Sequence, residues 1–139
     1  DEQRLYVHAH CAEDRMAALK ADQAGRDAPV WQDDDLALML NCGGTAYKLE
    51  VSASGAFFDA REGEAAWNGA WEVAVHRGTG GWDLEASLPW RDLDWTPQAG
   101  LCFGVNWCRQ EKPHGEVSAW LPGGINDGWN VGAVMLMSL

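Results

Sequence analysis

Apolar and polar residues alternate along most of this chain, and this period of two limits the fold more than any other feature. The segment LYVHAHC at 5–11 has its apolar residues at odd positions and its polar residues at even ones. Successive side chains of a strand point to opposite faces, so the segment is predicted to be a strand with one buried face. Similar patterns predict further strands at 36–40, 45–52, 56–60, 72–76, 82–88, 101–109, 117–120 and 131–137.

Turn signals separate these predicted strands. They are NCGG at 41–44, SASG at 52–55, RGTGG at 77–81, PGG at 122–124 and NDG at 126–128. Many short strands joined by tight turns are typical of an antiparallel sandwich and not of a parallel α/β sheet. We therefore expect an all-β fold: an antiparallel β-sandwich of the jelly-roll or immunoglobulin-like kind. It would form one domain over residues 1–139, with one or two short helices at 13–21 and 89–93.

The balance of charge excludes two classes of partner. The chain has 21 acidic against 10 basic residues and a net charge of −11. Binding to a nucleic-acid backbone or to an anionic membrane surface needs clustered Lys and Arg. No apolar run approaches the length of a membrane span. We expect no nucleic-acid binding and no membrane insertion, whereas neutral ligands, or ligands bridged by a cation, are compatible with this charge.

Four cysteines leave the redox state open. Cys11, Cys42, Cys102 and Cys108 allow two disulfides in three pairings, and none of them belongs to a CxxC pair of the zinc-knuckle type. An exported protein would pair them, but buried free thiols are an equal alternative. Because the first residue is Asp1 and not Met, we expect a processed chain or a piece of a longer protein.

Nine tryptophans are spread along the 139 residues. Indole combines a broad apolar face with a single N–H, which suits partly solvent-exposed sites that stack on a ring-shaped ligand. Trp82 and Trp107 share the apolar faces of their predicted strands and are expected in the core. Trp129 lies in a turn and is expected to be exposed. Trp31 is expected either to form a platform for a ligand or to pack beneath the acidic run that follows it.

Two groups of residues suggest metal binding. Asp33, Asp34 and Asp35 form the densest anionic cluster, and carboxylate oxygens suit calcium, although a calcium site needs six to eight oxygens from several segments. The alternative is a loop of solvated or capping carboxylates. His8 and His10 lie on one face of a predicted strand, which is the geometry of a metal-binding pair. Two solvent-facing histidines are the simpler interpretation.

An ordered series of segments resembles the family 9 carbohydrate-binding modules and their wider DOMON-like relatives. The segments are LYV at 5–7, RDAPVWQDDDLALML at 26–40, YKLEVSASGAFFDAR at 47–61, GWDLEASLPWRDL at 81–93, FGVNWCRQ at 103–110, SAW at 118–120 and VGAVML at 131–136. They cover nearly the whole chain. In that family the opening strands precede the LYV segment, so the resemblance implies a chain that lacks them and leaves a sheet edge open.

The resemblance implies a β-sandwich that holds a sugar between two tryptophans, with calcium at structural sites. Trp31 in VWQDDD matches the first stacking tryptophan. The second lies before the final strand, where Trp129 is the better match and Trp120 the weaker one. Calcium would then involve Asp33, Asp34 and Asp35, or these residues would order the loop that carries Trp31.

The chain also departs from the family's pattern, and two hypotheses follow. An acidic residue usually follows the first tryptophan by six positions, where this chain has Ala37, and Glu50 and Ser52 replace polar or basic ligand positions. A site built to bond hydroxyls loses much without its acceptor. The leading hypothesis is non-catalytic binding of a glycan. The alternative is a structural or assembly domain that has lost the sugar site and associates with neighbouring chains by strand exchange.

No catalytic motif is present. The sequence has no GxSxG, no HExxH and no phosphate-binding loop, and its paired carboxylates show no glycosidase arrangement. We therefore expect a non-enzyme. An exported location is expected for it: extracellular, at the cell surface or periplasmic.

Overall fold

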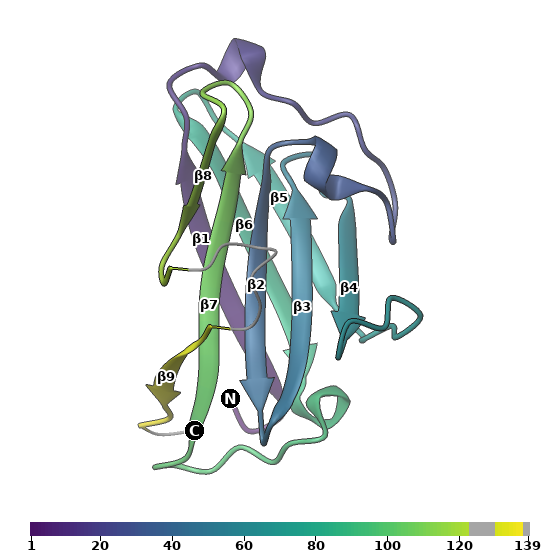
Figure 1. Cartoon of the computed structure of the whole chain (residues 1–139), viewed down its shortest axis with the longest axis vertical. Helices are drawn as coiled ribbons and strands as arrows, with labels where there is room; N and C mark the ends of the chain where they lie inside the picture. Colours follow the sequence, from purple (N-terminus) through teal and green to yellow (C-terminus); the bar gives the residue numbers. More distant parts are fainter. Residues whose placement is uncertain (123–129, 138–139) are drawn as a thin grey trace.

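The computed structural model describes residues 1–122 and 130–137, which form nine strands in two antiparallel sheets (Figure 1). One sheet has the order β1–β6–β5, with β1 at Arg4–Ala12, β6 at Gly81–Pro89 and β5 at Glu72–Arg77. The other has the order β4–β3–β2–β7–β8, and β9 pairs with β7. Its strands are β4 (Phe57–Arg61), β3 (Thr45–Ser52), β2 (Asp35–Cys42), β7 (Cys102–Glu111), β8 (Glu116–Ala119) and β9 (Gly132–Met135). The predicted antiparallel sandwich is confirmed.

Every second residue of the central strands enters the core between the two sheets. Leu36, Leu38 and Leu40 of β2 pack in one cluster with Leu84 and Leu88 of β6. Burying a side chain of this size contributes roughly 1.5–3 kcal/mol, so the alternation read from the sequence is also the main source of stability.

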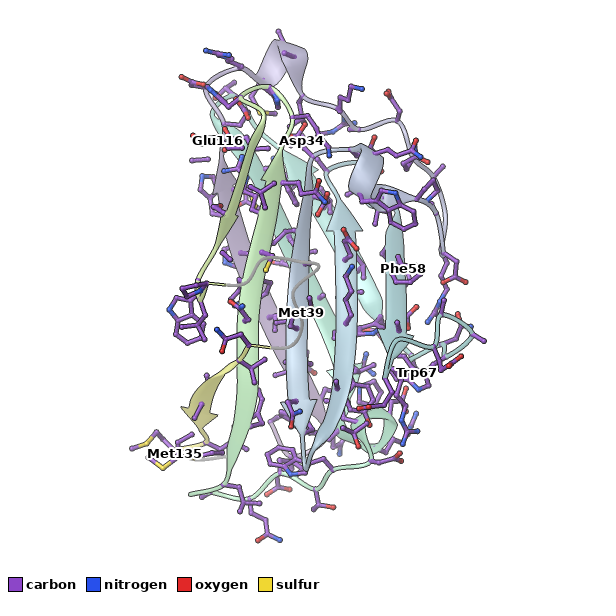
Figure 2. All side chains as sticks on the ribbon, viewed as in Figure 1. Asp34, Met39, Phe58, Trp67, Glu116 and Met135 are labelled. Carbon is purple, nitrogen blue, oxygen red and sulfur yellow. The ribbon has the colours of Figure 1, made fainter. Side chains whose placement is uncertain are left out.

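The outer face of the six-stranded sheet is buried as well where β2 crosses it. Asp35, Ala37 and Met39 point away from the core, yet each is at most 2% exposed; Met39 lies in the middle of the sheet (Figure 2). A strand covered on both faces reads as a nearly continuous apolar run, which is what DLALMLNC is. This covered outer face is therefore the part of the sandwich where polar groups are most costly.

The helical segments are single turns of 3-10 helix: η1 (Met16–Ala18), η2 (Val30–Gln32) and η3 (Trp90–Leu93). Among the residues described there is no α-helix: the short helix predicted at 13–21 is the single turn η1, and the turn predicted at 89–93 is η3. The turn η1 ends before Lys20, whose backbone N–H donates to the Asp34 carboxylate at 2.8 Å and not to a helical carbonyl. No helix in the described ranges is long and apolar enough to cross a membrane.

The aromatic residues divide as the alternation predicts. Trp82 is fully buried and Trp107 is half-buried against the core, while Trp90 packs into it from η3. Of the tryptophans left unassigned by the sequence, Trp71 is buried in the core and Trp67 packs against it.

The four cysteines are free thiols in the structure. Cys11, Cys42 and Cys108 are buried, and Cys102 is exposed. Burial raises the pKa of Cys11 to about 11 and that of Cys42 to about 12, so both thiols are kept in the unreactive protonated form.

Candidate functional site

Trp31 is held over the outer face of the six-stranded sheet. It lies in η2, just before β2, and is 47% exposed. Its ring meets the Phe58 ring of β4 edge to face, with centroids 6.0 Å apart. The Lys112 ammonium donates to the Trp31 carbonyl at 2.7 Å and to Gln110 Oε1 at 2.8 Å. The Trp31 backbone is thus anchored by Lys112, and nearly half of the residue remains exposed.

Polar groups lie beside this indole on the same face of the sheet. Lys48 of β3 stands 5.7 Å from the Phe58 ring centroid and forms an ion pair of 2.5 Å with Glu50. We call Trp31, Lys48, Phe58, Gln110 and Lys112 the Trp31 surface. It combines one apolar platform with two ammonium groups and an amide.

The register of the strands places a carboxylate next to Ala37, the position where the sequence has no acidic residue. Ala37 of β2 pairs with Glu50 of β3, and Glu50 pairs with Phe58 of β4. A buried carboxylate, paired with Lys48, therefore lies next to position 37 on the neighbouring strand. Sequence reasoning missed this because the pairing of two strands is not visible within either one.

Asp35 and Glu50 form a buried pair of acids under the Trp31 surface. Both side chains are fully buried, and among the described residues neither Asp35 oxygen has a hydrogen-bond partner. Burial, and next to it the charge of Glu50, raise the pKa of Asp35 to about 9. Asp35 is therefore a neutral acid at neutral pH, which lowers the cost of placing it beside a second carboxyl group.

The other two residues of the acidic run bind backbone amides. Asp33 accepts from the N–H groups of Asp22 and Gln23 and from the Ser52 hydroxyl, at 2.9–3.1 Å and 2.6 Å. Asp34 accepts from the N–H groups of Lys20 and Lys112. These contacts order the loop that carries Trp31. The same contacts use carboxylate oxygens of Asp33 and Asp34 that a calcium ion would need. Calcium at Asp33, Asp34 and Asp35 stays a prediction.

The tryptophans assigned to the sugar site are not all brought together. Trp120 is 56% exposed, and its backbone N–H bonds to Trp107 of β7, on the side of β7 away from β2. Trp31 lies beside β4, so most of the width of the sheet separates the two indoles, at about 4.8 Å per strand. Trp129 falls outside the described residues.

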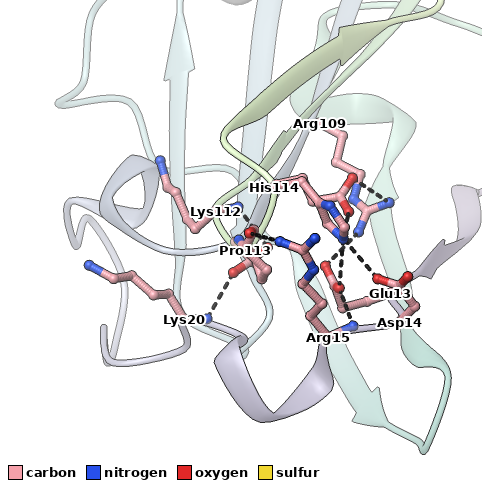
Figure 3. Close-up of polar contacts among 10 residues, drawn as sticks. Glu13, Asp14, Arg15, Lys20, Arg109, Lys112, Pro113 and His114 are labelled. Carbon is pink, nitrogen blue, oxygen red and sulfur yellow. Dashed lines mark hydrogen bonds and ion pairs between the residues drawn. The ribbon is translucent and has the colours of Figure 1, made fainter.

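A second polar cluster lies where β1 and β7 end at the same tip of the sandwich (Figure 3). Glu13, Glu111 and His114 each offer one ligand atom, and these atoms lie within 4.8 Å of one another. The group has the composition and reach to hold a metal ion. Arg109 lies beside it and pairs with Glu13 and Glu111.

The histidines of β1 lie on the outer face of the three-stranded sheet. His10 Nδ1 is 2.8 Å from Asp83 of β6, and His8 Nε2 is 3.7 Å from the same oxygen. The hydrogen bond with His10 lowers the pKa of Asp83. Both histidines are exposed, as the simpler interpretation of their pattern predicted.

Comparison with known proteins places this geometry in a known fold. No family model and no curated protein matches the sequence. Among solved structures, a putative carbohydrate-binding protein from Bacteroides uniformis matches with a TM-score of 0.75 at 14% identity, over 97% of this chain and 74% of that one. A family 9 carbohydrate-binding module from Caldicellulosiruptor kristjanssonii in complex with glucose matches with a TM-score of 0.72 at 15% identity, over 100% and 73%.

A family 9 module from the same organism in complex with cellotriose gives a TM-score of 0.69 at 16% identity, over 100% of this chain and 72% of that one. At such identities the likeness shows the fold, which is the fold that the sequence resemblance implied. The sandwich of this chain is that of the family 9 modules, and the chain spans nearly three quarters of their length.

Proposed function

We propose that this chain binds carbohydrate without catalysis, at the Trp31 surface. The observation that carries the proposal is the half-exposed Trp31 indole, fixed by Lys112 on the outer face of the sheet. Structures of the same fold hold glucose and cellotriose, which supports this class of ligand. A role outside the cytoplasm, where polysaccharides occur, is part of the same proposal.

The chemistry of the surface fits a pyranose ring. The apolar C–H face of the sugar stacks on the free face of Trp31, while the amide of Gln110 and the ammonium of Lys48 bond its hydroxyls. Glu50 lies beneath and holds Lys48 by their ion pair. Such a shallow, polar site gives modest affinity, since desolvation of the polar groups offsets much of the contact.

The two other assigned tryptophans have separate roles in this proposal. Trp120 lies too far across the sheet to stack on the same ring as Trp31, so it supports a more distant unit of an oligosaccharide. Trp129 remains the proposed second side of the ring that Trp31 stacks on.

Titration calorimetry with glucose and with cellotriose tests the proposal. Trp31→Ala is expected to weaken binding about tenfold or more, because a central aromatic carries a large share of the binding energy of a small interface. Tyr6→Ala is the matched control, since Tyr6 is exposed on the other sheet. The proposal is wrong if neither sugar binds, or if the two variants bind equally well.

Self-association through a sheet edge is the alternative function. Strand β1 pairs with β6 along nine residues and, within residues 1–122 and 130–137, with no other strand. A long open edge is a template for pairing with another chain. Gel filtration over about a hundredfold range of protein concentration would show a concentration-dependent size if β1 pairs in this way. A monomer throughout that range excludes self-association, and unchanged sugar binding by the monomer separates the two functions.

A further inference from the structure

The cluster at the tip of the sandwich joins the two sheets through groups that are far apart in the sequence. Glu13 and Asp14 directly follow β1 of the three-stranded sheet. Glu111 ends β7 of the six-stranded sheet, and His114 lies three residues later in the turn to β8. Arg15 ties the two segments by a hydrogen bond of 3.0 Å to the Pro113 carbonyl. The cluster thus stands on two strand ends that the fold already holds together.

Two distances inside the cluster match the edges of a coordination tetrahedron. His114 Nε2 lies 3.5 Å from Glu13 Oε1 and 3.5 Å from Glu111 Oε1. Two ligands bonded to zinc at about 2.1 Å with a tetrahedral angle between them are about 3.4 Å apart. Asp14 Oδ1 forms a hydrogen bond of 2.8 Å with the same nitrogen, from an exposed side chain, and an ion bound to that nitrogen would replace this bond.

The buried member of the cluster has an unused oxygen. The Glu13 side chain is fully buried, and its Oε2 atom has no hydrogen-bond partner in the part of the chain described. Its nearest cation, Arg109 Nη2, is 3.8 Å away, beyond hydrogen-bond distance. The other oxygen, Oε1, accepts from the backbone N–H of Arg15 at 2.6 Å and is the atom that faces His114. A buried carboxylate with only this hydrogen bond is costly unless a further positive charge approaches it.

Arg109 lies near the other oxygens of the two carboxylates. It is 3.8 Å from Oε2 of Glu13 and 3.5 Å from Oε2 of Glu111, whereas Oε1 of each lies near His114. At these distances Arg109 contributes charge and leaves both Oε1 atoms available to an ion. A hollow of about 430 Å³ opens beside the cluster and gives an ion access. Its lining includes Glu13, Asp14, Gly80, Glu111, His114 and Glu116.

We infer that Glu13, Glu111 and His114 form a structural site for a divalent transition-metal ion of the zinc type, with Asp14 or water as the fourth ligand. The imidazole nitrogen selects such an ion over calcium, which takes oxygen ligands. The ion links the end of β1 to the end of β7 and so fastens one sheet to the other. This site is separate from the Trp31 surface and from the acidic run.

The test uses the whole chain after treatment with a chelator. Zn²⁺ is expected to bind at one equivalent in calorimetry and to raise Tm, and Co²⁺ to give the visible absorption of a tetrahedral site. Ca²⁺ is expected to do neither. His114→Gln should weaken Zn²⁺ binding about a hundredfold or more, whereas His8→Gln, at an exposed histidine of the other sheet, should leave it unchanged.

Several results would overturn the inference: no zinc binding, equal binding by the His114→Gln and His8→Gln variants, or calcium binding as tight as zinc. Glu111→Gln is the second variant in case His114→Gln does not fold, which far-ultraviolet circular dichroism would show. Because Glu111 is a ligand here, its loss must also abolish the Co²⁺ spectrum.

Discussion

The buried acid Asp35 should make the stability of this chain fall as pH rises. Burial and the adjacent Glu50 raise the pKa of Asp35 to about 9, whereas an aspartate in an unfolded chain titrates near pH 4. Between these values the folded protein holds a proton that the unfolded chain has released. The contribution of Asp35 is therefore fully present below about pH 4 and is lost as pH approaches the folded-state pKa.

The magnitude follows from linkage. One proton held only by the folded state changes the free energy of unfolding by about −1.4 kcal/mol per pH unit, or about 4 kcal/mol from pH 5 to pH 8. Asp35→Asn keeps the shape of the neutral acid and removes the titration. Between pH 5 and pH 8 the free energy of unfolding of the variant, relative to that of the wild type, is thus expected to rise by about 4 kcal/mol. Other groups with a raised pKa, such as Asp34, are common to both proteins and cancel in this difference.

Urea unfolding followed by tryptophan fluorescence at several pH values gives the required free energies. Asp22→Asn, which removes an exposed carboxylate, is the matched control. Its free energy of unfolding, plotted against pH, should run parallel to that of the wild type. If the curve of Asp35→Asn also runs parallel to that of the wild type, Asp35 is ionised in the folded protein and the reasoning fails.

Three further changes test the packing of the sandwich. Leu38→Ala, at the centre of the core, is expected to cost about 2–5 kcal/mol of unfolding free energy in a urea titration, and a smaller loss would show that the core collapses around the gap. Asp59→Ala removes the buried partner of Arg26 and of the Gly69 N–H, and should cost about 3 kcal/mol or more in the same assay, unlike a change at an exposed carboxylate. Gly81→Ala would drive a methyl group into the Cys11 carbonyl of the neighbouring strand, so Tm should fall by several degrees, and an unchanged Tm would contradict the close approach of β1 and β6.

Local patterns were enough to find the strands. Each of the nine predicted segments corresponds to an observed strand, because alternation and turn residues act within a few positions of the chain. The segment at 13–21 forms only a single 3-10 turn, and the backbone N–H of Lys20 donates to the carboxylate of Asp34, far along the chain. Helix propensity is a weak preference that such a tertiary contact overrides.

The candidate sites were harder to predict than the strands because they depend on pairing. Trp31 was identified by the match of VWQDDD to the family's stacking tryptophan, and it is half-exposed as a platform must be. That Glu50 stands opposite Ala37 is a matter of register, which neither strand reveals alone. The cluster of Glu13 with Glu111 and His114 joins residues about a hundred positions apart. Its one local signal, an acid and a histidine three residues apart at a strand end, is too common to identify a site.

The four-residue turn at 112–115 contributes a residue to each of the two candidate sites. Lys112, at its start, holds the Trp31 carbonyl, and its own N–H is bound by Asp34. His114 belongs to the metal cluster only two residues later. If an ion at the cluster restrains this turn, the protein would lose less conformational entropy when a sugar then binds at Trp31. Coupling between two binding equilibria is reciprocal. A bound glycan would then raise the affinity for the metal ion by the same factor, so a metal titration with and without the glycan would measure the coupling.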